Sequence, residues 1–228
     1  MPRQAGPVTI DRERDVCTAG TVHSVRANGW LQLIEQNPGH SAWYIERFRS
    51  MAAEGRDLDG EARFIDAMLP RRARVLDAGC GQGRVGGKLA EFGHDVVGAD
   101  IDPDLVAAAA QAYPAVAWVV ADLAALDLAG DGLDGAGPTC EFDAVVCAGN
   151  VMTFLDTATR RAVIERLGVH LSDRGRLVVG FGSGRGYGFD EFLADVAAAG
   201  LREEVRLSSW DLRPFTPTSD FLVAVLVR

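Results

Sequence analysis

The sequence predicts an α/β protein with a doubly wound, mostly parallel β-sheet, and two observations support this prediction. From residue 74 onward, short apolar runs alternate with segments of helical period, and strands that are apolar throughout are typical of parallel sheets covered by helices on both faces. The last two segments that read as strands, 202–210 and 221–227, follow each other without a helix between them. We therefore expect seven strands, with an antiparallel C-terminal strand at one edge of the sheet.

Two or three helices are expected before the first strand. Trp30 and Ile34 recur at helical spacing, and the Asn-Pro-Gly sequence at 37–39 ends this first helix. Ser41 is the expected N-cap of the second helix, and a third helix stops before Pro70.

The remaining elements follow from the alternation of strand and helix patterns. The expected strands are 74–78, 95–99, 116–120, 142–147, 176–181, 202–210 and 221–227. The expected helices between them are 84–92, 104–112, 158–171 and 189–199. The predicted organisation is a loose N-terminal tail (1–26), an N-terminal helical segment (27–70) and an α/β domain (71–228), with an outward glycine-rich loop at 129–138.

Composition and charge restrict the function classes. Hydrophobic residues make up 48% and charged residues 24% of the 228 residues, which is the balance of an ordinary globular protein. The 23 Lys and Arg against 32 Asp and Glu give a net charge of −9, which argues against nucleic-acid partners because these are bound through basic surfaces. The four cysteines form no Cys-x-x-Cys pair, so we expect free thiols and no metal site. No signal sequence or membrane-spanning segment is recognisable, and a soluble cytoplasmic protein is expected.

A glycine-rich turn, Asp77-Ala-Gly79-Cys-Gly81-Gln-Gly83, joins the first strand to the following helix. Residues without Cβ permit a tight turn and let backbone N–H groups approach a ligand closely. The spacing Gly81-x-Gly83-x-x-Gly86 also matches the dinucleotide fingerprint, with Asp100 near the position of a ribose-binding acid. That fingerprint should begin directly after the strand, however, and the first glycine there is Gly79. We therefore expect a nucleotide-like cofactor at this turn, in a register that disfavours a dinucleotide.

Further chemistry-bearing residues follow the next strands. Asp100 closes the second strand, Asp122 follows the third, and the fourth runs into Cys147-Ala-Gly-Asn150. Together with the turn, these segments resemble the motifs of class I S-adenosylmethionine-dependent methyltransferases of the small-molecule type, from about residue 74 to the C-terminus. The resemblance implies a Rossmann-like fold, S-adenosylmethionine as cofactor, and methyl transfer to a small-molecule acceptor. The Asn/Asp-Pro-Pro-aromatic motif of DNA and protein-amide methyltransferases is absent, which argues against those substrates.

The resemblance also implies roles for individual residues. In that family the turn wraps the methionine and ribose portions of the cofactor, the residue matching Asp100 accepts from the ribose hydroxyls, and the residue matching Asp122 accepts from the adenine amine. Arg47 would pair with the cofactor carboxylate. The cofactor-binding residues implied in this way are Asp77, Ala78, Gly79, Cys80, Gly81, Gly83, Asp100, Ile101, Asp122, Leu123, Cys147, Ala148 and Arg47.

In the same family the helices before the first strand often lie across the cofactor as a lid. By this resemblance His40 and Tyr44 are candidate catalytic residues. Packing of an amphipathic helix on the sheet is the alternative interpretation of the aromatic side chains here.

Four residues are candidates for binding the acceptor. They are Trp43 in the lid, Asn150 after the fourth strand, Tyr187 in the glycine-rich stretch 182–188, and Arg213 between the last two strands. Arg213 would select an anionic substrate, and the alternative is a surface charge paired with Asp211.

Two other function classes stay open at this point. A nicotinamide-dependent oxidoreductase would use the same turn, although the sequence has no Tyr-x-x-x-Lys pair. A non-catalytic relative would bind the cofactor and act through a partner, although Asp77, Asp100 and Asp122 are all intact. Oxygen, nitrogen and carbon acceptors share this scaffold, so the sequence specifies neither the acceptor atom, nor the use of a general base, nor the oligomeric state.

Overall fold

The structure is a computed structural model that describes residues 28–128 and 141–228. The tail predicted at 1–26 and the loop predicted at 129–138 lie outside these ranges. The strands are β1 Arg74–Ala78, β2 Asp95–Asp100, β3 Ala117–Val120, β4 Phe142–Cys147, β5 Leu171–Gly182, β6 Arg202–Leu207 and β7 Phe221–Val227. The helices are α2 Gly29–Gln36, α3 His40–Ala53, α4 Gly60–Met68, α5 Arg84–Glu91, α6 Pro103–Ala112, α7 Val151–Phe154, α8 Arg160–Val169 and α9 Phe189–Ala198, with a 3-10 turn η1 at Leu123–Ala125.

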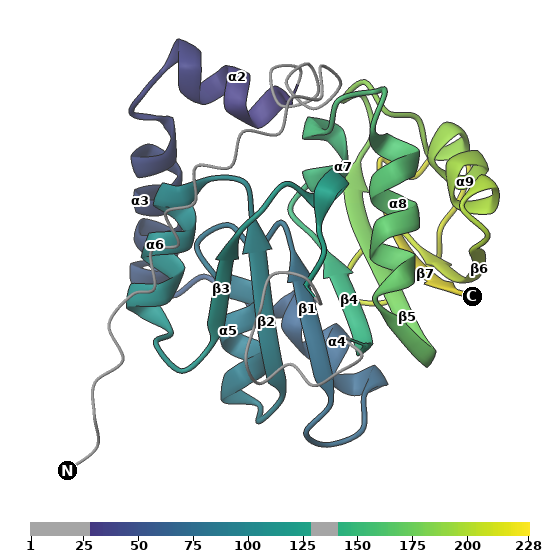
Figure 1. Ribbon diagram of the computed structural model, residues 1–228, viewed down its shortest axis with the longest axis horizontal. Helices are drawn as coiled ribbons and strands as arrows, with labels where there is room; N and C mark the ends of the chain where they lie inside the picture. Colours follow the sequence, from purple (N-terminus) through teal and green to yellow (C-terminus); the bar gives the residue numbers. More distant parts are fainter. Residues whose placement is uncertain (1–27, 129–140) are drawn as a thin grey trace.

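In the described part of the chain, these strands form one seven-stranded sheet in the order β3-β2-β1-β4-β5-β7-β6 (Figure 1). Strands β1 to β5 pair in parallel, whereas β7 runs antiparallel to both β5 and β6. Because β7 lies between these two neighbours, β6 forms the outer edge of the antiparallel pair. The predicted fold class is confirmed.

Two apolar cores lie on opposite faces of the sheet. Successive side chains of a strand point to opposite faces. Val75 therefore belongs to the core that includes residues of α4 and α5, and its neighbour Leu76 to the core that includes residues of α8 and α9. Both side chains are fully buried. This two-sided burial explains why the central strands are mostly apolar, whereas β6 at the edge is charged and largely exposed.

Three features of the elements differ from the prediction. Helix α3 begins at His40 with Gly39 as its N-cap, and no side chain caps it, so the prediction of Ser41 as N-cap was wrong. Strand β5 begins at Leu171 and passes through an irregular register before it pairs regularly with β4. The short helix α7 at Val151–Phe154 was not predicted.

The order of strands reverses direction between β1 and β4. In open α/β sheets, ligands bind beyond the carboxyl ends of the strands at such a reversal. Figure 1 shows α2 and α3 at this end of the sheet, while α4 packs with α5 on one of its faces. Of the three N-terminal helices in the described ranges, α2 and α3 form a lid over the reversal point and α4 does not. None of the helices in the described ranges has the length and apolar character needed to cross a bilayer.

Candidate functional site

A cavity of about 460 Å³ lies between the carboxyl ends of the central strands and the lid formed by α2 and α3. Its walls combine the glycine-rich turn, the ends of β2 and β4, the start of α7, and the loop after β5. The cavity is also lined by residues that were not predicted from the sequence as site residues. These are Asn28, Trp30, Leu33, Phe48, Gln82, Arg84, Val85, Leu105, Gly149, Val151, Phe154, Leu155 and Arg185.

The glycine-rich turn forms one wall of this cavity with its backbone. Gly79, Gly81 and Gly83 have φ angles of +79°, +54° and +82°, which side-chain-bearing residues rarely adopt. The N–H groups of Gly79 and Cys80 donate to the carbonyl of Ala99, at 2.8 and 3.0 Å. A Cβ on Gly79 would lie 2.4 Å from Val151 Cγ2. The turn is therefore fixed to the end of β2, and close packing against α7 excludes a side chain at Gly79.

Asp77 is a buried carboxyl group at the end of β1, beneath the turn. One of its oxygens accepts from Gly86 N–H in the first turn of α5, at 2.7 Å. Burial raises the pKa of this carboxyl to about 7, although the Gly86 hydrogen bond opposes the rise. The charge of Arg84 also lowers this pKa, but no described residue forms an ion pair with Asp77. Its negative charge is therefore disfavoured, and a cationic ligand in the cavity would stabilise that charge.

Asp100 and Asp122 present carboxylates to the same cavity. Asp100 accepts from Gly81 N–H at 2.8 Å and from Asp102 N–H at 2.9 Å. Asp122 accepts from Ala124 N–H at 2.9 Å. A carboxylate has about four lone-pair sites, so each of these groups keeps acceptor capacity for a ligand. Two such acids, on adjacent strands of the sheet, suit a ligand with hydroxyl or amino donors at two separate positions.

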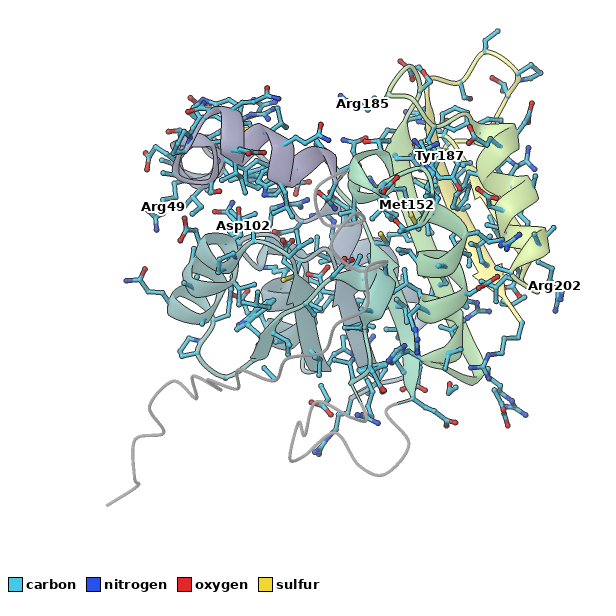
Figure 2. The ribbon with its side chains drawn as sticks, turned by 45° about the horizontal axis from the view of Figure 1, so that its top comes forward. Arg49, Asp102, Met152, Arg185, Tyr187 and Arg202 are labelled. Carbon is cyan, nitrogen blue, oxygen red and sulfur yellow. The ribbon has the colours of Figure 1, made fainter. Side chains whose placement is uncertain are left out.

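Asp102 holds the lid to the α/β domain. Its Oδ1 accepts from Asp104 N–H at 2.9 Å and so caps α6. Its Oδ2 accepts from Trp30 Nε1–H on α2 at 2.9 Å and from Ser41 Oγ–H on α3 at 2.6 Å. The side chain lies where α6 begins, below the N-terminal helices (Figure 2). One buried carboxylate therefore joins three helices, two residues after Asp100.

An aromatic cluster forms the inner surface of the lid. Trp30 packs edge to face against His40, Tyr44 and Phe154, with ring centroids 5.0, 5.2 and 5.6 Å apart. Burial raises the pKa of Tyr44, so its hydroxyl stays protonated and is a hydrogen-bond donor rather than a base. The cluster closes the cavity with apolar rings and brings His40 and Tyr44 to its wall.

Arg47 and Arg84 both line the cavity but differ in their partners. Arg84 forms a bidentate pair with Glu61, with N–O distances of 2.9 and 2.5 Å, and its Nη1 also donates to Leu58 O. Arg47 lies 5.7 Å from the ring centroid of Trp43 and makes no ion pair with a carboxylate in the described ranges. Arg47 is therefore the cation of this pair that is free to bind an anionic group.

The structure brings most of the predicted site residues to the cavity. The predicted residues that line it are His40, Trp43, Tyr44, Arg47, Asp77, Gly79, Cys80, Gly81, Asp100, Ile101, Asp122, Leu123, Ala148 and Asn150. Ala78 and Cys147 do not line it because both are fully buried in the sheet. Gly83 lies behind the turn, where it packs against Ala109 and Trp118.

Two predicted substrate residues lie away from the cavity and are corrected here. The Tyr187 side chain is buried, and its hydroxyl donates to Asp195 Oδ2 at 2.6 Å. Arg213 is 75% exposed and pairs with Asp211 at 3.2 Å, as its alternative interpretation supposed. The cavity wall instead carries Arg185 from the same glycine-rich stretch as Tyr187.

Comparison with known proteins shows that the chain is similar to methyltransferases. The methyltransferase domain family model matches residues 75–175. The solved structure of a TehB-like SAM-dependent methyltransferase from Corynebacterium glutamicum ATCC 13032 is 47% identical, with a TM-score of 0.78, and the match covers 84% of this chain and 100% of that one.

Two further relatives are more distant. "Putative methyltransferase YqeM" of Bacillus subtilis (strain 168) is 32% identical over 110 residues, which is 47% of this chain but only 40% of that protein's length. The SAM-bound structure of CalS10, an amino pentose methyltransferase from Micromonospora echinaspora, is 22% identical with a TM-score of 0.58, over 78% of this chain and 96% of that one. At this level of identity, the likeness to CalS10 is one of fold alone.

Proposed function

The chain belongs to the S-adenosylmethionine-dependent methyltransferases, and from this premise we propose that it methylates a small-molecule acceptor held in the cavity beneath α2 and α3. The observation that carries the proposal is that one cavity joins the glycine-rich turn, Asp100 and Asp122 with the aromatic inner surface of the lid. A roofed cavity of about 460 Å³ suits small ligands, and the net charge of −9 disfavours polyanionic acceptors.

The residues present fit S-adenosylmethionine, which supplies a methyl group activated by a sulfonium. The turn offers its backbone to the methionine and ribose portions, Asp100 has acceptor sites left for the ribose hydroxyls, and Asp122 has them for the adenine amine. Ile101 and Leu123, each next in sequence to one of these acids, also line the cavity. Arg47, which makes no ion pair among the described residues, would hold the cofactor carboxylate.

The chain's own contribution to the reaction is mainly alignment. Displacement at a methyl group needs the nucleophile in line with the leaving group, and a rigid, roofed cavity supplies that orientation. Tyr44 keeps its proton and would orient an acceptor or the cofactor as a hydrogen-bond donor. His40 is the candidate general base for an acceptor that must lose a proton. Asn150 borders the cavity from the end of β4.

Substitution of Asp100 tests the proposed cofactor position. Asp100→Ala should weaken S-adenosylmethionine binding by about 10- to 100-fold, because each lost hydrogen bond to a charged acceptor contributes roughly 1.5–3 kcal/mol. Isothermal titration calorimetry with S-adenosylmethionine and S-adenosylhomocysteine measures the change. Asp104→Ala, an exposed aspartate in the first turn of α6, is the matched control and should bind normally. Unchanged affinity in Asp100→Ala would refute the assigned role.

A further inference from the structure

The loop that follows β5, residues 182–188, is rich in glycine yet fastened at several points. Gly182 N–H donates to Asn150 Oδ1 at 2.8 Å, and Ser183 N–H donates to Asp220 O at 2.8 Å. Arg160, which is 5% exposed, donates from Nη2 to Gly186 O at 2.7 Å. Buried Tyr187 closes the loop through its bond to Asp195. These contacts fix the backbone of the loop, and with it the point from which a side chain of the loop reaches the cavity.

Arg185 is the charged side chain that this loop contributes to the cavity. Its side chain makes no hydrogen bond or ion pair with the residues described, in contrast to Arg84, which is paired with Glu61. Figure 2 places Arg185 at the tip of the loop, on the side toward the lid, whereas Tyr187 lies inside the domain. Arg185 and Asn150 both lie close to Gly182, since a Cβ built on this glycine would lie 3.5 Å from Arg185 Nε and 3.6 Å from Asn150 Oδ1. The guanidinium therefore extends from the Asn150 end of the cavity.

The cavity is electrostatically divided. The three carboxylates Asp77, Asp100 and Asp122 lie at the ends of β1 to β3, and Arg47 reaches the cavity from α3. Arg185 enters from the opposite wall, beyond β4. With Arg47 engaged by the cofactor carboxylate, an anionic group is repelled by the ionised carboxylates of this acidic wall and attracted to Arg185, so a molecule with one charged end would enter in a single orientation.

Building on the proposed function, we propose that Arg185 determines specificity by binding a carboxylate or phosphate group of the methyl acceptor. The guanidinium fork matches either oxyanion with two parallel hydrogen bonds. Trp30 and Phe154, which line the cavity together, receive the apolar part of the same molecule. The acceptor is thus a small anionic compound with an apolar or aromatic body, bound with its charged end at Arg185 and its other end toward the cofactor.

Matched pairs of small probes test this inference on the full chain saturated with S-adenosylhomocysteine. Benzoate and phenyl phosphate carry the two oxyanions, and benzamide is the neutral counterpart of benzoate. Ligand-detected NMR titration should show at least one of the two anions binding five- to tenfold more tightly than benzamide. Arg185→Gln should abolish that preference, and Arg213→Gln, which removes an exposed arginine outside the cavity, should preserve it.

Three outcomes would count against the inference, each in a different way. Equal binding of all three probes to the unmodified chain, or an anion preference that survives in Arg185→Gln, overturns it. A tenfold or greater loss of S-adenosylhomocysteine affinity in Arg185→Gln also overturns it, because Arg185 would then hold the cofactor. If S-adenosylhomocysteine fails to bind the unmodified chain, the proposed function fails first; normal cofactor binding without anion preference refutes the role of Arg185 alone.

Discussion

Asp77 is a carboxyl group whose surroundings favour its protonated form. Burial raises its pKa from 3.8 to about 7. Below about pH 4 the folded and unfolded chains both carry the proton, and the group contributes nothing unfavourable. Between these pKa values the unfolded chain has released a proton that the folded chain retains, so the stability of the cofactor-free protein falls as pH rises toward 7. Above pH 7 the ionised carboxyl is buried and forms no ion pair with any of the described residues.

Replacing Asp77 with Asn should remove this pH dependence. Asn keeps an oxygen to accept from Gly86 N–H and cannot ionise, so Asp77→Asn should be more stable than the parent by up to a few kcal/mol at pH 8 and should differ little at pH 4. Urea unfolding between these pH values measures the difference, with exposed Asp104→Asn as control. A difference that stays constant with pH would contradict the assigned pKa.

Gly83 illustrates a second constraint at the residue scale, one of space as well as of backbone conformation. Its φ is +82°, and a Cβ there would lie 2.8 Å from both Ala109 Cβ and Trp118 Cη2. Gly93 has a φ of +93° with open space around it. Gly93→Ala should cost about 1–2 kcal/mol for the left-handed backbone alone, and Gly83→Ala should add about 1–3 kcal/mol for overpacking. Equal losses in urea unfolding would show that packing around Gly83 yields without cost.

Among the elements, the attachment of the lid to α6 is the feature with the clearest consequence. Ser41 Oγ and Trp30 Nε1 both donate to the buried carboxylate of Asp102, and a hydrogen bond to a charged group contributes about 1.5–3 kcal/mol. Ser41→Ala should therefore loosen α2 and α3 and weaken S-adenosylmethionine binding by about three- to tenfold. Hydrogen exchange should accelerate in α2 and α3 and stay unchanged in α8 and α9.

Ser50→Ala is the matched control because Ser50 lies on the same helix and is exposed. It should alter neither exchange nor affinity. If Ser41→Ala binds the cofactor normally while α2 and α3 exchange faster, the lid is held by Asp102 but does not contribute to cofactor binding.

The elements also show what the sequence allows one to predict. β1, β4 and β7 were predicted with their observed bounds because each is a short, mostly apolar run that begins at or directly after a charged residue. The start of β5 was missed because Ser-Asp-Arg-Gly at 172–175 is polar and resembles a loop. The helix α7 was missed because four residues carry too little periodicity to be recognised.

At the site, too, residues that follow a local sequence pattern could be predicted, whereas residues placed by contacts between distant segments could not. Asp100 was identified because parallel strands bring their carboxyl ends together, so that position along the chain predicts position in space. Arg185 and Phe154 were missed because their place in the cavity depends on contacts between segments far apart in sequence, such as Trp30 with Phe154. The stretch 182–188 was recognised, but Tyr187 was chosen in place of Arg185. The Tyr187 ring is buried in the core against Phe181 and Phe192, and this leaves Arg185 as the side chain that lines the cavity.

At the scale of the whole molecule, charge and cofactor are complementary. The chain carries a net charge of −9, and three of its carboxylates line the cavity. S-adenosylmethionine is a net cation near neutral pH because of its sulfonium, whereas S-adenosylhomocysteine has lost that charge. A field of this sign attracts the cofactor over a range set by the Debye length, about 30 Å at 0.01 M salt and about 10 Å at 0.1 M.

Salt should therefore separate the binding kinetics of the two ligands. Raising the ionic strength from about 0.01 M to about 0.3 M should slow association of S-adenosylmethionine by about two- to fivefold, while association of S-adenosylhomocysteine should change little. Stopped-flow fluorescence measures both rates, since Trp30 lines the cavity. Equal salt dependence for both ligands would mean that the net charge plays no part in their capture. An anionic acceptor should show the opposite trend, because screening weakens its repulsion from the acidic surface before Arg185 can bind it.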